Sequence, residues 1–217
     1  MVNTFFNSLR EIMTCYNNYI NQIESEARRS EDGRAYGGKI RSSKGALVEE
    51  IAQSLVHIAW KQILGQSDRI DITGHKISYT SKFGDTYSFK PDVLVKIDSK
   101  LIMAIECKAY AEIAMFKRIL VDALIVKNAC NNADYVLLQL ESQLGGDFST
   151  LTPNPIGSPS TRALSDFLGI SVKVITLLEG ERKVDRPIHV RKYQKNLNFT
   201  SLNNALNTFK ETLKVYV

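Results

Sequence analysis

Hydrophobic residues recur along this 217-residue chain with two different periods. Steps of three and four residues, together with strongly apolar or well-bounded segments, predict helices at 4–29, 43–64, 111–130, 160–169 and 201–217. Short runs rich in branched residues predict strands at 93–97, 101–105, 135–140 and 171–178. A helix followed by a continuous apolar strand is typical of a βαβ unit. The pattern therefore predicts an α/β fold with a mixed β-sheet flanked by helices.

Length and composition indicate one globular domain. The 217 residues, 44% hydrophobic and 24% charged, are enough for a sizeable core. We expect a single domain over 1–217, in which about 43–178 form the core and the helix at 4–29 and the segment 179–217 are additions. The sequence contains no glycine-rich loop of the Walker or Rossmann type, which argues against a separate ATPase or methyltransferase domain.

Cysteine usage and hydropathy predict a cytoplasmic protein. The three cysteines, Cys15, Cys107 and Cys130, form neither a paired framework nor a zinc-binding spacing. The N-terminal segment has charged residues before any long apolar run, and no segment reaches about 18 consecutive apolar residues, so we expect neither a signal peptide nor a membrane partner. The net charge of +5 mildly favours an anionic partner such as nucleic acid.

Charged residues interrupt the apolar pattern in the segment KPDVLVKIDSKLIMAIECKAY, residues 90–110. A three-residue hairpin loop centred on Ser99 places Asp92 opposite Glu106, and Lys108 two residues further lies on the same strand face. Two adjacent carboxylates repel each other unless they share a proton or a cation, and their hard oxygens suit Mg²⁺. The alternative is a carboxylate–lysine cluster that only solvates a sheet edge.

The pair Pro91-Asp92 followed by Glu106-Cys107-Lys108 resembles the motif of the PD-(D/E)xK nuclease superfamily, the fold of most type II restriction endonucleases. The resemblance covers about residues 43–178 and implies a restriction-endonuclease-like core. It implies that Asp92, Glu106 and the Cys107 backbone carbonyl bind Mg²⁺. It further implies that Lys108 orients or deprotonates the attacking water and stabilises the developing negative charge.

The resembled family often adds an acidic residue from a preceding helix, and this chain offers Glu49 and Glu50. Glu49 lies nearer the edge of the apolar stripe of the predicted helix 43–64, so we expect Glu49 to face the hairpin and join the catalytic site. The alternative is that both glutamates lie on a solvated helix face.

Two basic segments flank the motif. We expect residues 28–45 to be a loop and 179–196 to be a basic connection, and both offer phosphate contacts. The candidate DNA-binding residues are Lys39, Arg41, Lys44, Arg182, Lys183, Arg186, Arg191 and Lys192. A long loop at 141–159 is a further candidate for DNA contact. The alternative for residues 28–45 is a solvated basic linker, and for residues 179–196 it is a solvated hairpin that carries both signs of charge.

The resemblance implies a Mg²⁺-dependent type II restriction enzyme that cuts double-stranded DNA at a specific site and leaves 5′-phosphate ends. A homodimer is expected because two strands must be cut and twofold assemblies are common. Two alternatives keep the fold. One is a structure-specific repair or junction-resolving nuclease, and the other is a non-catalytic DNA-binding protein on the same scaffold.

Overall fold

A mixed β-sheet forms the centre of the molecule. The structure, a computed structural model, describes residues 5–27, 33–65, 68–130, 133–147, 149, 158–186 and 190–217. The helices are α1 (Leu9–Ala27), α2 (Gly33–Leu64), α3 (Ile113–Ala129), α4 (Pro159–Leu168) and α5 (Phe199–Lys214). The strands are β1 (Ile70–Thr73), β2 (Ile77–Thr80), β3 (Thr86–Phe89), β4 (Val93–Ile97), β5 (Lys100–Glu112), β6 (Asp134–Gln143) and β7 (Lys173–Thr176). Each element predicted from the hydrophobic pattern is present; β4 has the predicted bounds, and the ends of the other predicted elements are shifted.

The sheet has five strands in the order β1-β4-β5-β6-β7. The pairs β1–β4 and β4–β5 are antiparallel, whereas β5–β6 and β6–β7 are parallel and are joined across α3 and α4. The predicted α/β fold, a mixed sheet flanked by helices, is confirmed. Of the predicted loop 141–159, the first three residues belong to β6 and Pro159 begins α4, whereas residues 148 and 150–157 lie outside the described residues.

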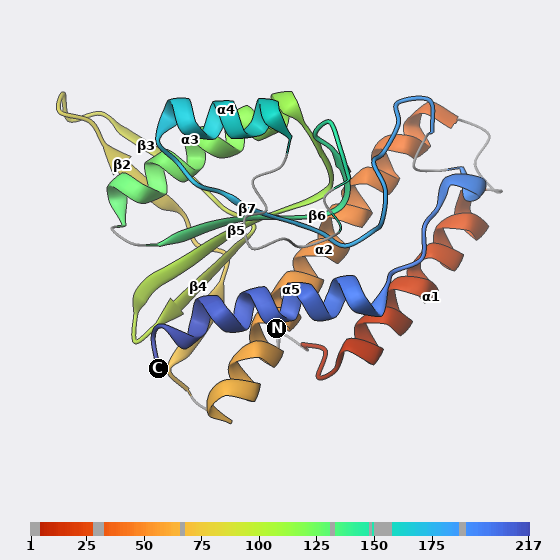
Figure 1. The fold of residues 1–217 in the computed structure, drawn as a ribbon, viewed down its shortest axis with the longest axis horizontal. Coiled ribbons are helices and arrows are strands. Elements are labelled where there is room, and N and C mark those ends of the chain that lie inside the picture. Colours follow the sequence, from red (N-terminus) through yellow and green to blue (C-terminus); the bar gives the residue numbers. More distant parts are fainter. Residues whose placement is uncertain are drawn as a thin grey trace.

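Helices cover both faces of the sheet, with α3 and α4 on one side and α1, α2 and α5 on the other (Figure 1). Successive residues of a strand therefore pack in two different hydrophobic cores, one on each face of the sheet. Val136 and Leu138 of β6 pack with α2 and α5, whereas Tyr135 and Leu137 pack with α3. A sheet buried on both faces needs such continuous apolar strands. No helix in the described part of the chain is long and apolar enough to span a membrane.

The apolar stripe of helix α1 packs against other elements of the same chain. Ile12, Tyr16 and Ile20 are buried in the same core as α2 and α5. The Tyr16 hydroxyl donates a hydrogen bond of 2.9 Å to the backbone carbonyl of Lys195. This stripe therefore fixes the C-terminal segment on the core.

The helix α2 begins earlier than the sequence predicts. Residues 33–42 belong to the 32-residue helix Gly33–Leu64, so the prediction of a loop over the described part of 28–45 is wrong. Glycine disfavours a helix by about 1 kcal/mol per residue. Tertiary packing offsets this preference, because Ile40 is 3% exposed and lies in a cluster with Ala109 and Tyr110 of β5. The residues expected on a flexible loop are thus held on a helix that crosses the sheet.

The β4–β5 hairpin has a tighter turn than predicted. Ile97 pairs with Lys100, so the loop has two residues, Asp98 and Ser99, both with positive φ (49° and 67°), rather than three. A register shift follows between Val95 and Lys96, where β5 contributes an extra residue. Beyond this bulge Val93 pairs with Ile105, which is the register that the sequence predicts at the motif.

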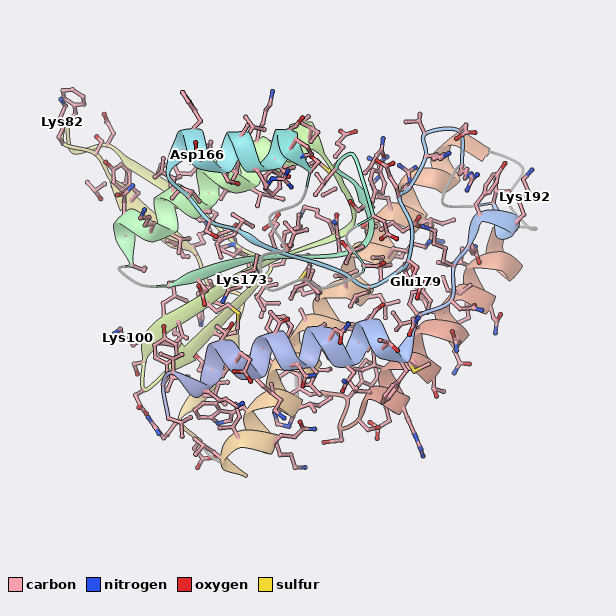
Figure 2. All side chains as sticks on the ribbon, viewed as in Figure 1. Lys82, Lys100, Asp166, Lys173, Glu179 and Lys192 are labelled. Carbon is pink, nitrogen blue, oxygen red and sulfur yellow. The ribbon has the colours of Figure 1, made fainter. Side chains whose placement is uncertain are left out.

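The strands β2 and β3 form a separate two-stranded hairpin. It projects from the body of the molecule, and Lys82 lies at its tip (Figures 1 and 2). Phe83 at the same tip is 79% exposed.

Phe116→Ala is expected to destabilise the fold by about 3–5 kcal/mol, because a fully buried phenylalanine leaves a cavity when truncated. Phe116 is 0% exposed and packs α3 onto the sheet. Val121→Ala on the same helix is the matched control, since Val121 is 50% exposed and its truncation is expected to change stability by less than about 0.5 kcal/mol. Urea denaturation of both variants measures the difference, and equal losses would contradict the packing described.

Candidate active site

Asp92 lies where the antiparallel pairing of β4 and β5 ends. The strand β4 begins at Val93, so within the described residues β5 beyond Ile105 pairs with β6 alone. The backbone N–H of Cys107 donates a hydrogen bond of 2.7 Å to Asp92 Oδ2 at this free edge. The Asp92 carboxylate therefore satisfies a strand N–H that has lost its ladder partner, and it is held close to Glu106 and Lys108.

Lys108 joins the two acidic residues of the motif. Its Nζ lies 2.5 Å from Glu106 Oε1 and 3.4 Å from Asp92 Oδ2. The same ammonium donates a hydrogen bond of 3.2 Å to the Cys107 backbone carbonyl. The Lys108 side chain is 31% exposed, so this cation is accessible from solvent while held between two carboxylates.

A pocket of about 380 Å³ opens on this group, and Glu49 of α2 lines it together with Asp92, Cys107 and Lys108. Glu50 instead lines a groove between α1 and α2. The predicted orientation of Glu49 toward the hairpin thus agrees with its position in the structure. Glu106 is not among the residues that line the pocket, and it reaches the site through Lys108.

Burial and neighbouring charges shift the pKa values of the acidic side chains and of Lys108 at this site. Burial raises the pKa of Glu49, and the nearby Asp92 charge raises it further. Burial likewise raises the pKa of Glu106, although Lys108 opposes the rise. Burial alone would lower the pKa of Lys108, but Glu106 and Asp92 outweigh it and raise this pKa. Three acidic side chains around one ammonium therefore favour additional positive charge.

The acidic side chains do not form a metal cage by themselves. No three His, Cys, Asp or Glu side chains lie close enough together to hold a metal ion in the part of the chain that the structure describes. What the site offers is carboxylate and carbonyl oxygens next to an open pocket, with Lys108 in contact with both motif carboxylates.

Tyr110, which sequence reasoning missed, brings two of the predicted DNA-binding arginines together as a cationic border of the site. The Arg41 guanidinium carbon lies 4.9 Å from the centroid of the Tyr110 ring, and that of Arg182 lies 3.9 Å from it. Both Arg41 and Tyr110 line the pocket that contains Asp92 and Lys108. The two-residue period of a strand was the available signal, because Glu106, Lys108 and Tyr110 alternate along β5.

The other predicted DNA-binding residues are spread over the molecule. Lys39, Lys183, Arg186 and Lys192 are exposed, and Lys192 lies at one end of the molecule, on the short 3₁₀ helix Arg191–Tyr193 (Figure 2). The Arg191 side chain lies outside the described residues.

Lys44 requires a correction, because it is 2% exposed and does not lie on the surface as a phosphate contact would. Burial lowers its pKa, and the nearby Glu141 charge opposes this change. The cause is the packing of α2 against β5 and β6, which buries the helix face that carries Lys44.

Gln139 is a second residue that sequence reasoning missed. It is 0% exposed, its Oε1 accepts a hydrogen bond of 3.0 Å from the Ala111 N–H, and its Nε2 donates one of 3.0 Å to Thr176 Oγ1. It therefore ties the distal half of β5, which carries the motif, to β7. A polar residue within the apolar run YVLLQL was the available signal.

The comparisons with known proteins identify the class of this chain. It is 39% identical, over 229 residues that cover 94% of the chain and 95% of the relative, to a curated type II restriction enzyme. The chain therefore belongs to the family of type II restriction enzymes. The relative is DdeI from Desulfomicrobium norvegicum. The predicted site-specific DNA endonuclease with a restriction-endonuclease fold is thus confirmed, in preference to a repair or junction-resolving nuclease.

Two further comparisons complete this result. No protein-family model matches the chain. Among solved structures, the native BbvCI A2B2 tetramer at low resolution aligns with 96% of this chain and 88% of that chain, at 12% identity and a TM-score of 0.43.

Proposed function

We propose that this enzyme hydrolyses double-stranded DNA with Mg²⁺ at the site formed by Asp92, Glu106 and Lys108, leaving 5′-phosphate ends. The observation that carries the proposal is the position of Lys108. Its ammonium contacts both Asp92 and Glu106 at the mouth of a pocket that Glu49 also lines. A cation, two or three carboxylates and an open cavity are the groups that metal-assisted phosphodiester hydrolysis needs.

The donor atoms present fit Mg²⁺. Asp92, Glu49 and Cys107 line the pocket, and their carboxylate and carbonyl oxygens are of the hard type that Mg²⁺ prefers. Asp92, Glu106 and the Cys107 carbonyl would hold the ion, with Glu49 as a further acidic group. A bound Mg²⁺ lowers the pKa of water and neutralises charge on the phosphate.

Lys108 and its neighbours act on the water and on the phosphate. A lysine ammonium is a compact charge with movable donors, so Lys108 orients the attacking water and stabilises negative charge as it develops on phosphorus. Attack of hydroxide forms one P–O bond, and the bond to the 3′ oxygen breaks. The 3′ oxygen takes up a proton, and the phosphate remains on the 5′ end.

The cationic border at Tyr110 supports DNA as the substrate. Arg41 and Arg182 lie over this ring, beside the pocket. A DNA strand that places one phosphate at Lys108 would bring the neighbouring phosphates close to these two arginines. Packing on an aromatic ring restricts a guanidinium while leaving donors for phosphate. Lys39, Lys183, Arg186, Arg191 and Lys192 remain candidates for further backbone contacts.

We further propose a cytoplasmic homodimer, within which each chain is a single nuclease domain. One chain has one such site among its described residues, whereas a duplex has two strands to cut. The packing of α1 and α5 onto the same core as the sheet supports one domain over residues 1–217. Light scattering that gives the mass of one 24.4 kDa chain on cognate duplex would contradict the homodimer.

Digestion of unmethylated plasmid and phage DNA tests the proposed activity. Discrete bands are expected with Mg²⁺ and none with EDTA, and sequencing of the ends is expected to show 5′-phosphates at one recurring sequence. A smear, cleavage confined to branched DNA, or bands that persist in EDTA would each overturn part of the proposal. A smear would contradict site specificity, and cleavage confined to branched DNA would contradict the duplex substrate. Bands that persist in EDTA would contradict the requirement for a metal ion.

A further inference from the structure

The β2–β3 hairpin is connected directly to the candidate active site. Only Lys90 and Pro91 separate the end of β3 at Phe89 from Asp92. The hairpin projects from the molecule, and Lys82 lies at its tip, far along the ribbon from the sheet (Figure 2). At about 3.3 Å per residue, the six steps from Phe83 to Phe89 extend about 20 Å. DNA bound at Asp92 therefore passes within reach of this ribbon.

One face of the hairpin consists of hydroxyl groups. Ser78 pairs with Ser88, and Thr80 pairs with Thr86. Their side chains form cross-strand hydrogen bonds of 2.7 Å and 3.2 Å, and all four residues are exposed. We call these four residues the hydroxyl face.

Lysines extend the hydroxyl face at the base of the ribbon. By continuation of the register, Lys76 and Lys90 lie on the same face as Ser78 and Ser88 at the base of the ribbon. Lys90 is close enough to the active site to lower the pKa of Glu49, although burial outweighs this effect. Residues 76–90 contain three lysines against one aspartate, so the ribbon is cationic.

The opposite face anchors the hairpin. Ile77 is 7% exposed in the core with α3, and Phe89 packs against the same core. The ring of Tyr87 stacks on that of Phe89 with centroids 6.3 Å apart. Ile77 and Phe89 thus anchor the base of the ribbon, and the hydroxyl face is left toward solvent, as are Tyr79 and Tyr87 further out on the aromatic face, which are 41% and 54% exposed.

We propose that the hydroxyl face enters a groove of the DNA beside the cleaved phosphate and reads base edges, so that this hairpin determines part of the recognised sequence. The inference rests on the proposed function and names the element that would give it specificity. A two-stranded ribbon fits the major groove, which is about 12 Å wide. Serine and threonine hydroxyls both donate and accept hydrogen bonds, as base edges require, and the flanking lysines contact phosphates.

The test removes the four hydroxyls and keeps the strands. The variant Ser78→Ala, Thr80→Val, Thr86→Val and Ser88→Ala is expected to lower the cleavage rate on wild-type sites at least about 100-fold, or about 2.7 kcal/mol. Its binding to random duplex, measured by anisotropy, is expected to change less than about threefold because the lysines remain. The matched control is Tyr79→Phe with Tyr87→Phe, which removes two hydroxyls from the aromatic face and is expected to leave cleavage unchanged.

Crosslinking gives a readout that needs no cleavage. A photoreactive benzoylphenylalanine at position 80 is expected to crosslink to duplex DNA, and one at position 79 is not. A wild-type chain that cuts nothing would refute the proposed function, and the crosslinks would still decide the position of the ribbon. The inference is overturned if the hydroxyl-free variant cuts the same sites at the wild-type rate. It is also overturned if position 80 crosslinks only to a second copy of the chain.

Discussion

Asp92→Asn is expected to lower the rate of DNA cleavage about 1,000-fold, equivalent to about 4 kcal/mol of transition-state stabilisation. The amide removes the negative charge that would hold the metal. It keeps an oxygen able to accept the 2.7 Å hydrogen bond from the Cys107 N–H. The fold is therefore expected to retain its stability, and duplex binding without metal is expected to stay within about threefold. Single-turnover cleavage, urea denaturation and anisotropy measure these three quantities.

Asp92→Ala is the informative comparison, since it removes both the charge and the acceptor. Its cleavage is expected to be as low as that of Asp92→Asn, but it is expected to lose a further 1–2 kcal/mol or so of stability because the Cys107 N–H loses its partner at the end of the ladder. Cleavage by Asp92→Asn within tenfold of wild type would show that the carboxylate charge is not required. Equal stability of the two variants would show that the hydrogen bond contributes nothing to the fold.

Lys108→Met is expected to slow the chemical step about 100- to 1,000-fold, because methionine fills similar volume but has neither the charge nor the donors that act on water and phosphate. The ammonium lies 2.5 Å from Glu106 Oε1, so the substitution removes a charge that directly contacts a residue of the motif. The measurement is the single-turnover rate at saturating enzyme with Mg²⁺. Binding of the duplex is expected to change little, since one half-buried cation among many basic residues is removed.

Lys117→Met is the matched control for this substitution. Lys117 is exposed on α3 and does not line the pocket, so the same chemical change there is expected to alter the rate less than twofold. If Lys108→Met retained more than about a tenth of the wild-type rate, Lys108 would be a structural counter-ion for Glu106 and Asp92 rather than a participant in hydrolysis.

The hydrophobic pattern predicted the sheet and its helices because each element buries a continuous or periodic apolar surface. It failed at the start of α2, where the glycines near residue 38 indicate a loop and the packing of Ile40 on Tyr110 overrides that preference. Helical phase predicted that Glu49 rather than Glu50 faces the motif, and the structure places it there.

Other parts of the site depend on contacts between distant segments. Arg41 and Arg182 are 141 positions apart in the numbering yet lie over one tyrosine ring, and neither charge pattern nor periodicity specifies that contact. The buried position of Lys44 has the same origin, because only the crossing of α2 over the sheet decides which of its residues are covered. Sequence alone therefore identified the acidic and basic residues of the site, but it did not identify the residues that they contact in space.

The bulge in β5 makes the distance between Asp92 and Glu106 along the chain tolerant of insertion and deletion. The two-residue turn alone would pair Val93 with residue 104, and the extra residue near Ile102 shifts the partner to Ile105. A chain that lacked that residue would still pair Val93 with the residue before the glutamate, at the expense of one buried side chain. Two hairpins that differ in length by this one residue would therefore hold the two acidic groups at the same place, and an alignment with fixed motif spacing would separate them.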